Sequence, residues 1–156
     1  MEVKNNLLKL GIEALDKDFY NHLSSRSKKY TNLQFLFEDK ISEISRPILS
    51  KFKIEPDTIS IIKIQPNVLV DWHVDSPTFK RNTVIIFPLC PQIKDYAPCE
   101  TKQGLIAPSE CYAFNTTVMH KVQNNQYLRL SLQLFFQRGI HELNDLYITN
   151  NLIYDE

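Results

Sequence analysis

Apolar residues repeat at two different intervals along the chain, and the change between them falls near residue 57. Before it, residues 13–29 and 39–53 place apolar side chains three or four positions apart, which predicts helices. Pro47 interrupts the second pattern and predicts a kink or two short helices. After residue 57, the apolar runs are short, rich in β-branched residues and separated by turn residues, which predicts strands. The main predicted strands are residues 58–64, 68–75, 82–89, 105–114, 119–122 and 127–137.

Many short strands after a helical block predict an α+β fold that is mainly β. We expect a double-stranded β-helix (jelly-roll) barrel with N-terminal helices packed on one sheet. The length of 156 residues and the 43% hydrophobic content suit a single domain over 1–156. In this interpretation residues 1–56 give helical support, 57–137 form the jelly-roll core and 138–156 form a polar C-terminal tail. Asn124–Asn125 is a candidate hairpin turn.

His73, Asp75 and His120 are candidate metal ligands. Residues i and i+2 of a strand point to the same face, so His73 and Asp75 can reach one metal ion, with His120 arriving from a neighbouring strand. Two histidines and one carboxylate on one side of a metal are typical of the facial triad of non-haem Fe(II) oxygenases. A His-x-Asp tripeptide alone is weak evidence. The alternatives are a surface ion pair for His73 and Asp75, and a structural turn histidine for His120.

Residues 127–135 alternate, with leucines at every second position from Leu128 to Leu134 and polar side chains between them. Leucines fall on one face, and Arg129, Ser131 and Gln133 fall on the other. Taken alone, this polar face could be the wet side of an antiparallel strand. After His120 and an earlier His-x-Asp, it is better explained as the interior of a barrel. An arginine beside a hydroxyl suits a carboxylate, because arginine binds carboxylates through two parallel charge-assisted hydrogen bonds.

These motifs together resemble the 2-oxoglutarate and Fe(II)-dependent dioxygenases, over about residues 58–137. The matching positions, in order, are His73-Val74-Asp75, His120 and Arg129-Leu130-Ser131, and residues 111–116 are similar to the strand that leads to the family's second histidine. The chain is most similar to small aspartyl/asparaginyl- or prolyl-hydroxylase-like members. It departs from the aspartyl/asparaginyl branch, which often lacks the carboxylate ligand, since Asp75 is present. It also has Asn82 and Val84 where a basic residue or histidine would help to bind the cosubstrate.

The resemblance implies a hydroxylase that acts on a small molecule or an amino-acid side chain and releases succinate and CO2. It assigns His73, Asp75 and His120 as the catalytic, Fe(II)-binding residues. Arg129 and Ser131 would bind the far carboxylate of the cosubstrate 2-oxoglutarate, and O2 would be the second cosubstrate. The candidate supporting polar groups are Asn82, Asn115 and Gln133.

Composition narrows the alternatives. The formal net charge is zero and the sequence pI is about 6.9, so no overall field favours nucleic acid or anionic membrane. No apolar run approaches the roughly 20 residues that cross a bilayer, and the N-terminus does not resemble a signal peptide, so we expect a cytoplasmic protein. Three cysteines without C-x-x-C spacing are expected to be free thiols. Only three glycines occur, and none forms a phosphate-binding cluster.

Three other functions stay open. A nucleic-acid demethylase of the same superfamily would need a basic groove and base-stacking aromatic residues. A non-catalytic jelly-roll binding protein would not need Asp75 and Arg129. A cupin-type metal enzyme would more typically show an H-x-H motif.

The substrate is the least determined part of this interpretation. Lys80 and Arg81 follow the His-x-Asp motif, and Lys94 and Lys102 lie in a predicted long loop, 91–104. They are either ordinary solvated charges or a basic rim that favours a carboxylate-bearing substrate, such as an amino acid or an acidic peptide.

Overall fold

The computed structural model describes residues 30–32, 45–75, 82–89, 99–102, 104–106 and 112–154, and this part of the chain is mainly β. A short helical segment, 45–49, precedes the main run of strands. The strands are β1 (Tyr30–Asn32), β2 (Thr58–Ile64), β3 (Leu69–His73), β4 (Thr83–Pro88), β5 (Cys99–Thr101), β6 (Gly104–Ile106), β7 (Tyr112–Asn115), β8 (His120–Gln123) and β9 (Arg129–Phe136), followed by the helix α4 (Ile140–Ile148).

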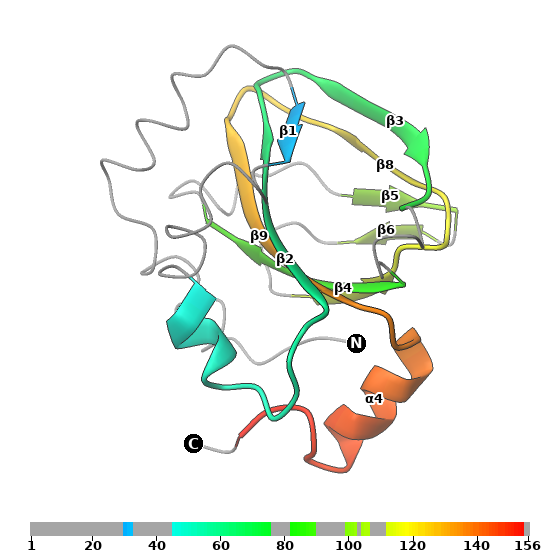
Figure 1. Cartoon of the computed structure of the whole chain (residues 1–156). Helices are drawn as coiled ribbons and strands as arrows, with labels where there is room; N and C mark the ends of the chain where they lie inside the picture. The colour runs from blue at the N-terminus through cyan, green and yellow to red at the C-terminus, as the bar shows by residue number, and fades with distance from the viewer. Residues whose placement is uncertain are drawn as a thin grey trace.

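The strands form two antiparallel sheets (Figure 1). The larger sheet has the order β1-β2-β9-β4-β7, and the smaller sheet has the order β3-β8-β5-β6. The pairs β2 with β9, β3 with β8, β4 with β7 and β5 with β6 are nested, like the rungs of one long hairpin. This hairpin is rolled up, so that its successive pairs fall alternately in the two sheets, and β4 also pairs with β9 and β5 with β8. Nested pairs shared between two sheets are the pattern of a jelly roll.

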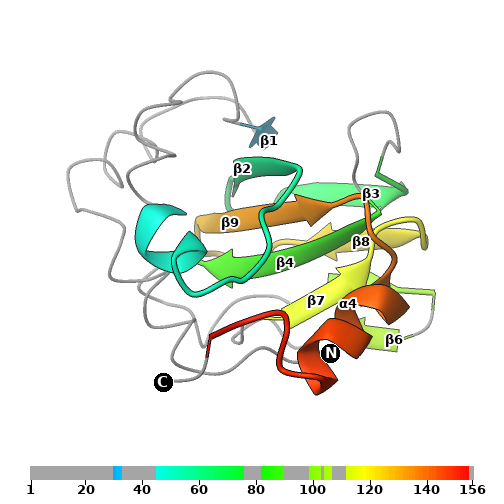
Figure 2. The ribbon, with the colours of Figure 1, turned by 60° about the horizontal axis from the view of Figure 1, so that its bottom comes forward.

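The two faces of β9 separate two environments, as its alternating sequence predicts. Leu130, Leu132 and Leu134 are fully buried on the outer face, in a core that also holds Leu143 of α4. The opposite side chains of β9 face the smaller sheet. Figure 2 shows β9 between β2 and β4, with α4 close to the same sheet. The outer core therefore stabilises the larger sheet, while the inner face of β9 carries Arg129, Ser131 and Gln133.

The strand predictions agree well with β2, β4 and β9. Between the predicted strands 58–64 and 68–75 the chain turns at Pro66-Asn67, and Asn67 has a positive φ of 62°, which asparagine tolerates better than most residues. The prediction for residues 68–75 was wrong at its end, because β3 stops at His73. Residues 105–114 were predicted as one strand, but β6 ends at Ile106 and β7 begins at Tyr112.

The C-terminal segment 138–156 was predicted as a polar tail, and that prediction was wrong. It contains α4, whose Leu143 is fully buried, and Ile153 beyond the helix forms a β-bridge with Phe52. Ile140, Leu143 and Tyr147 of α4 are spaced three or four apart, so a helical signal was present in the sequence, but it extends over only nine residues. The helix ends in a Schellman motif around Asn150, whose φ is 65°.

Asn124–Asn125 was predicted as a hairpin turn, but the strands on either side belong to different sheets. The buried Asn124 amide donates hydrogen bonds to the carbonyls of Ile64, Gln65 and Tyr127. Turn residues indicate a hairpin only where the flanking strands pair. Here the two asparagines lie in the connection from β8 in the smaller sheet to β9 in the larger sheet. The Asn124 side chain ties this connection to the turn between β2 and β3.

The N-terminal helix predicted at 13–29 and residues 39–44 of the one predicted at 39–53 lie outside the described residues. Within the second range, residues 45–49 are helical and include Pro47. No helix in the described part of the chain is long and apolar enough to cross a membrane.

Candidate metal centre

The jelly-roll pairing brings the two histidines of the predicted triad together. His73 is the last residue of β3 and His120 is the first residue of β8, and the two are directly paired across the smaller sheet. Asp75 follows β3, and its backbone N–H donates to the Thr116 carbonyl at 3.0 Å. The i and i+2 argument for a strand therefore does not apply to Asp75. The chain leaves the sheet after His73, and the bond to Thr116 fixes the position of the carboxylate.

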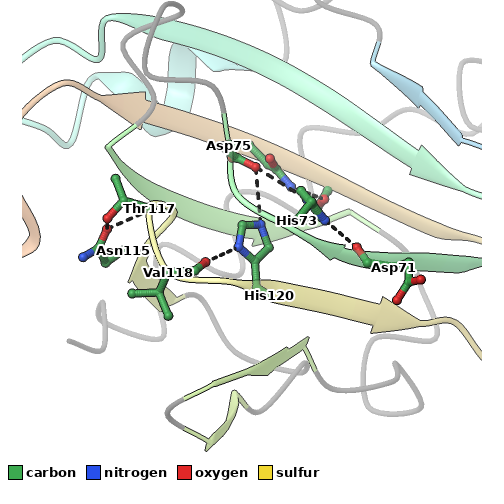
Figure 3. A network of polar contacts seen from close by, with 9 residues as sticks. Asp71, His73, Asp75, Asn115, Thr117, Val118 and His120 are labelled. Carbon is green, nitrogen blue, oxygen red and sulfur yellow. Dashed lines mark hydrogen bonds and ion pairs between the residues drawn. The ribbon is translucent and has the colours of Figure 1, made fainter.

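The ligand atoms of the triad lie within 4.8 Å of one another (Figure 3). Oδ1 of Asp75 lies 3.3 Å from Nε2 of His120 and 3.6 Å from Nε2 of His73. Adjacent ligand atoms on one ion, each about 2.1 Å from it, would be about 3 Å apart. In the described part of the chain this is the one group of three such residues that could hold a metal ion.

Backbone carbonyls orient both imidazoles in the same way. Nδ1 of His73 lies 2.7 Å from the carbonyl oxygen of Asp71, and Nδ1 of His120 lies 2.8 Å from that of Val118 (Figure 3). A carbonyl oxygen only accepts, so each Nδ1 carries the proton and each neutral ring keeps the lone pair on Nε2. Metal-binding histidines are usually fixed in this manner. The sequence showed the ligands but not these carbonyls, since any residue supplies one.

The electrostatics of the triad suit a cation. The hydrogen bond to the Asp75 carboxylate raises the pKa of His73 above 6.5 and outweighs the opposing effect of burial. Burial by itself would raise the pKa of Asp75, but hydrogen bonds from His120 and His73 and the charge on both rings lower it to about 2. Asp75 is therefore ionised at neutral pH. In the metal-free protein both imidazole rings interact with its carboxylate.

The triad opens into a cavity between the two sheets. Arg129, Ser131 and Gln133 of β9 line this cavity together with the three candidate ligands. Arg129 and Ser131 are 5% and 3% exposed, so they do not form a wet outer face. The rest of the wall is mostly apolar and includes Ile62, Ile64, Val84 and Ile86 of the larger sheet and Val70 and Val122 of the smaller sheet.

Two further residues of the wall were not assigned a role from the sequence. The Phe114 ring meets the His120 ring edge-on, with centroids 5.1 Å apart, and limits the movement of that imidazole. Cys99 is a buried free thiol in the same cavity. Burial raises its pKa to about 11, with Arg129 lowering and Asp75 raising the pKa to smaller extents. Phe114 lies in the segment 111–116 that resembles the strand before the family's second histidine, but only the folded sheet shows its contact with His120 and the position of Cys99.

The two asparagines predicted to support the cosubstrate lie elsewhere. The Asn82 side chain donates to the Gln137 carbonyl, and the Asn115 side chain accepts hydrogen bonds from the backbone and hydroxyl of Thr117 (Figure 3). Neither is among the residues that line the cavity. Both bonds hold chain segments at the ends of β4 and β7, and a role for these side chains in cosubstrate binding stays a prediction.

Of the four residues predicted to form a basic rim, Lys80, Arg81 and Lys94 lie outside the described residues. Lys102 is exposed, and its ammonium lies 3.9 Å from the centroid of the Trp72 ring. Nζ of Lys121 lies 4.9 Å from the same centroid. Trp72, which precedes His73 on β3, therefore contacts two cations, and none of these three residues lines the cavity.

Comparison with known proteins gives remote structural likenesses. No protein-family profile matches the sequence, and no curated protein sequence matches it significantly. Among solved structures, the chain is similar to a prolyl-4-hydroxylase from Pseudomonas putida, with a TM-score of 0.47 and 13% identity over 87% of this chain and 89% of that one. It is also similar to an ectoine synthase from P. lautus, with a TM-score of 0.38 and 16% identity over 93% of this chain and 85% of that one.

Proposed function

We propose that the protein is an Fe(II)- and 2-oxoglutarate-dependent dioxygenase that hydroxylates a small molecule or an amino-acid side chain, with succinate and CO2 as co-products. One observation carries this proposal. Three ligand atoms converge inside a jelly roll, in the same cavity as a buried arginine.

The donor set fits a divalent iron ion. His73, His120 and Asp75 would hold it, since both Nε2 lone pairs are directed away from the carbonyls that fix the rings. Two imidazoles and one carboxylate are the ligands typical of non-haem Fe(II) oxygenases. The bound ion would supply the activation of O2 and the oxidative decarboxylation of 2-oxoglutarate.

The chain's own residues have separate tasks in this proposal. Arg129 binds the far carboxylate of 2-oxoglutarate through charge-assisted hydrogen bonds, and the neighbouring Ser131 hydroxyl adds one more. The apolar wall excludes water from the cosubstrate, which strengthens these bonds. Phe114 keeps the His120 ring in place while ligands enter and leave.

The substrate is proposed to carry a carboxylate. Support comes from the sequence, where Lys80 and Arg81 follow the His-x-Asp motif within a few residues. Lys102 and Lys121 do not add to it. Lys121 lies between His120 and Val122, which line the cavity, so its side chain points to the opposite face of β8, where it and Lys102 contact Trp72.

The test is an anaerobic titration of the protein with Fe(II) and 2-oxoglutarate, followed by addition of O2 and measurement of succinate. Free amino acids, peptides and methylated oligonucleotides are then screened for the ability to stimulate succinate release. We expect 2-oxoglutarate to bind only after Fe(II), and a carboxylate-bearing compound to stimulate turnover. Absence of both 2-oxoglutarate binding and succinate would contradict the proposal, and stimulation only by methylated oligonucleotides would favour a demethylase.

A further inference from the structure

Ser131 and Gln133 form a polar pair inside the cavity. They lie two positions apart on β9, so both side chains point to the inner face of the larger sheet. Nε2 of Gln133 donates a hydrogen bond of 3.3 Å to Oγ of Ser131. Both residues line the cavity that holds the candidate metal ligands, and Ser131 is only 3% exposed.

This bond determines what the Ser131 hydroxyl can still do. A hydroxyl has one proton to donate and lone pairs that accept, and Gln133 already occupies an acceptor position. No acceptor for the Ser131 proton is found within hydrogen-bond distance among the described residues. Buried polar groups are rarely left without a partner, so this proton indicates a ligand that accepts.

The neighbouring charge shows which acceptor fits. Arg129 lies two positions before Ser131 on the same face, and a guanidinium has donors only. With its proton free, Ser131 adds a further donor to the same part of the cavity. A carboxylate, which only accepts, is complementary to such a pair. An amide would bring its own N–H groups against these donors.

We propose that Gln133 is a positioning residue that holds the Ser131 hydroxyl as a donor and thereby makes this end of the cavity selective for a carboxylate over an amide. The inference rests on the proposed function, in which that carboxylate is the far end of 2-oxoglutarate. Gln133 acts through Ser131 and contributes to the choice of cosubstrate without contacting the metal ligands.

The test compares Gln133→Leu, Gln133→Glu, Ser131→Ala and the double variant Ser131→Ala/Gln133→Leu with the parental protein. Binding of 2-oxoglutarate and of its 5-amide to the anaerobic Fe(II) protein is measured by calorimetry. Gln137→Leu is the matched control, because Gln137 is exposed just beyond the end of β9. Thermal melting of each variant reports any loss of folding.

Gln133→Leu should weaken 2-oxoglutarate binding about 2- to 10-fold, as expected for one neutral hydrogen bond. Gln133→Glu should weaken it more, roughly 10- to 100-fold, because a carboxylate at this position accepts the Ser131 proton and repels the ligand. That variant should also lose most of the preference for 2-oxoglutarate over the amide. The double variant should bind no more weakly than Ser131→Ala, since Gln133 acts only through Ser131.

Three outcomes would overturn the inference. If the parental protein binds 2-oxoglutarate and Gln133→Leu binds it equally well, Gln133 does not position Ser131. If the effects of Ser131→Ala and Gln133→Leu add in the double variant, Gln133 acts independently. If the parental Fe(II) protein does not bind 2-oxoglutarate at all, the proposed function fails and the inference fails with it.

Discussion

Asp75 has the largest expected effect of any single residue of the triad, because it carries the only negative charge among the three ligands. Asp75→Ala should reduce Fe(II) affinity by at least about 100-fold, since loss of an outer-shell partner alone typically costs 10- to 100-fold. Asp71→Ala is the matched control. Asp71 is exposed, and its carboxylate accepts a hydrogen bond from the Trp72 N–H, so it should leave Fe(II) affinity nearly unchanged. Calorimetric titration of both variants would show whether Asp75 is a ligand, and equal Fe(II) affinities would exclude it.

Arg129 tests the cosubstrate end of the cavity separately from the metal. Arg129→Ala should weaken 2-oxoglutarate binding roughly 10- to 100-fold, because charge-assisted hydrogen bonds contribute about 1.5–3 kcal/mol. Fe(II) affinity should change little. Arg138→Ala is a suitable control, since Arg138 is exposed and pairs with Glu142 of α4. If Arg129→Ala binds 2-oxoglutarate as tightly as the parental protein does, the far carboxylate of 2-oxoglutarate binds elsewhere.

At the scale of elements, the helix α4 belongs to the outer core of the larger sheet. Leu143 is fully buried there, whereas Ile148 of the same helix is 71% exposed. Leu143→Ala should therefore lower the free energy of unfolding by about 2–5 kcal/mol, and Ile148→Ala should change it by less than about 0.5 kcal/mol. Urea unfolding of the two variants measures this difference. Equal stabilities would mean that α4 does not stabilise the sheet.

The elements also show what a sequence can predict and what it cannot. β9 was predicted well, because the alternation from Leu128 to Leu134 is a strong local signal and the two faces of the strand lie in different environments. α4 was missed although its apolar residues are spaced three or four apart, because the helix has only nine residues and gives a short signal. The end of β3 was misplaced because it depends on a hydrogen bond from Asp75 to Thr116, a residue some 40 positions away. Local patterns predict elements, whereas their ends depend on distant partners.

At the scale of the whole molecule, the nested pairing of strands assembles the site. His73 and His120 are 47 positions apart in the chain but directly opposite each other, because β3 pairs with β8 within the rolled hairpin. The same roll places β9 across the cavity from them. The sequence indicated each candidate ligand through its motif. The positions of Cys99 and Phe114 in the cavity wall became visible only once the sheets were assembled, because they depend on which strands face each other.

The triad should couple the stability of the whole fold to pH, in opposite directions with and without metal. The raised pKa of His73 means that the folded, metal-free protein binds this proton more tightly than the unfolded chain does. Its contribution to stability is therefore fully present below pH 6.5 and is lost as pH rises through the raised pKa. The lowered pKa of Asp75 gives a contribution that is fully present above pH 3.8 and is lost as pH falls toward about 2.

The affinity for metal should instead increase as pH rises above 6.5, because only the neutral imidazole of His73 offers its Nε2 lone pair to a metal ion. Between pH 6 and 8 we therefore expect the melting temperature of the metal-free protein to fall as pH rises, while the increase caused by a fixed excess of Fe(II) under anaerobic conditions grows. Asp75→Asn should make the melting temperature of the metal-free protein less dependent on pH. It should also abolish most of the increase in melting temperature that Fe(II) causes. His141→Ala should change neither, since His141 lies exposed on α4. An Fe(II)-induced increase that is independent of pH, or that survives in Asp75→Asn, would show that the metal binds outside this triad.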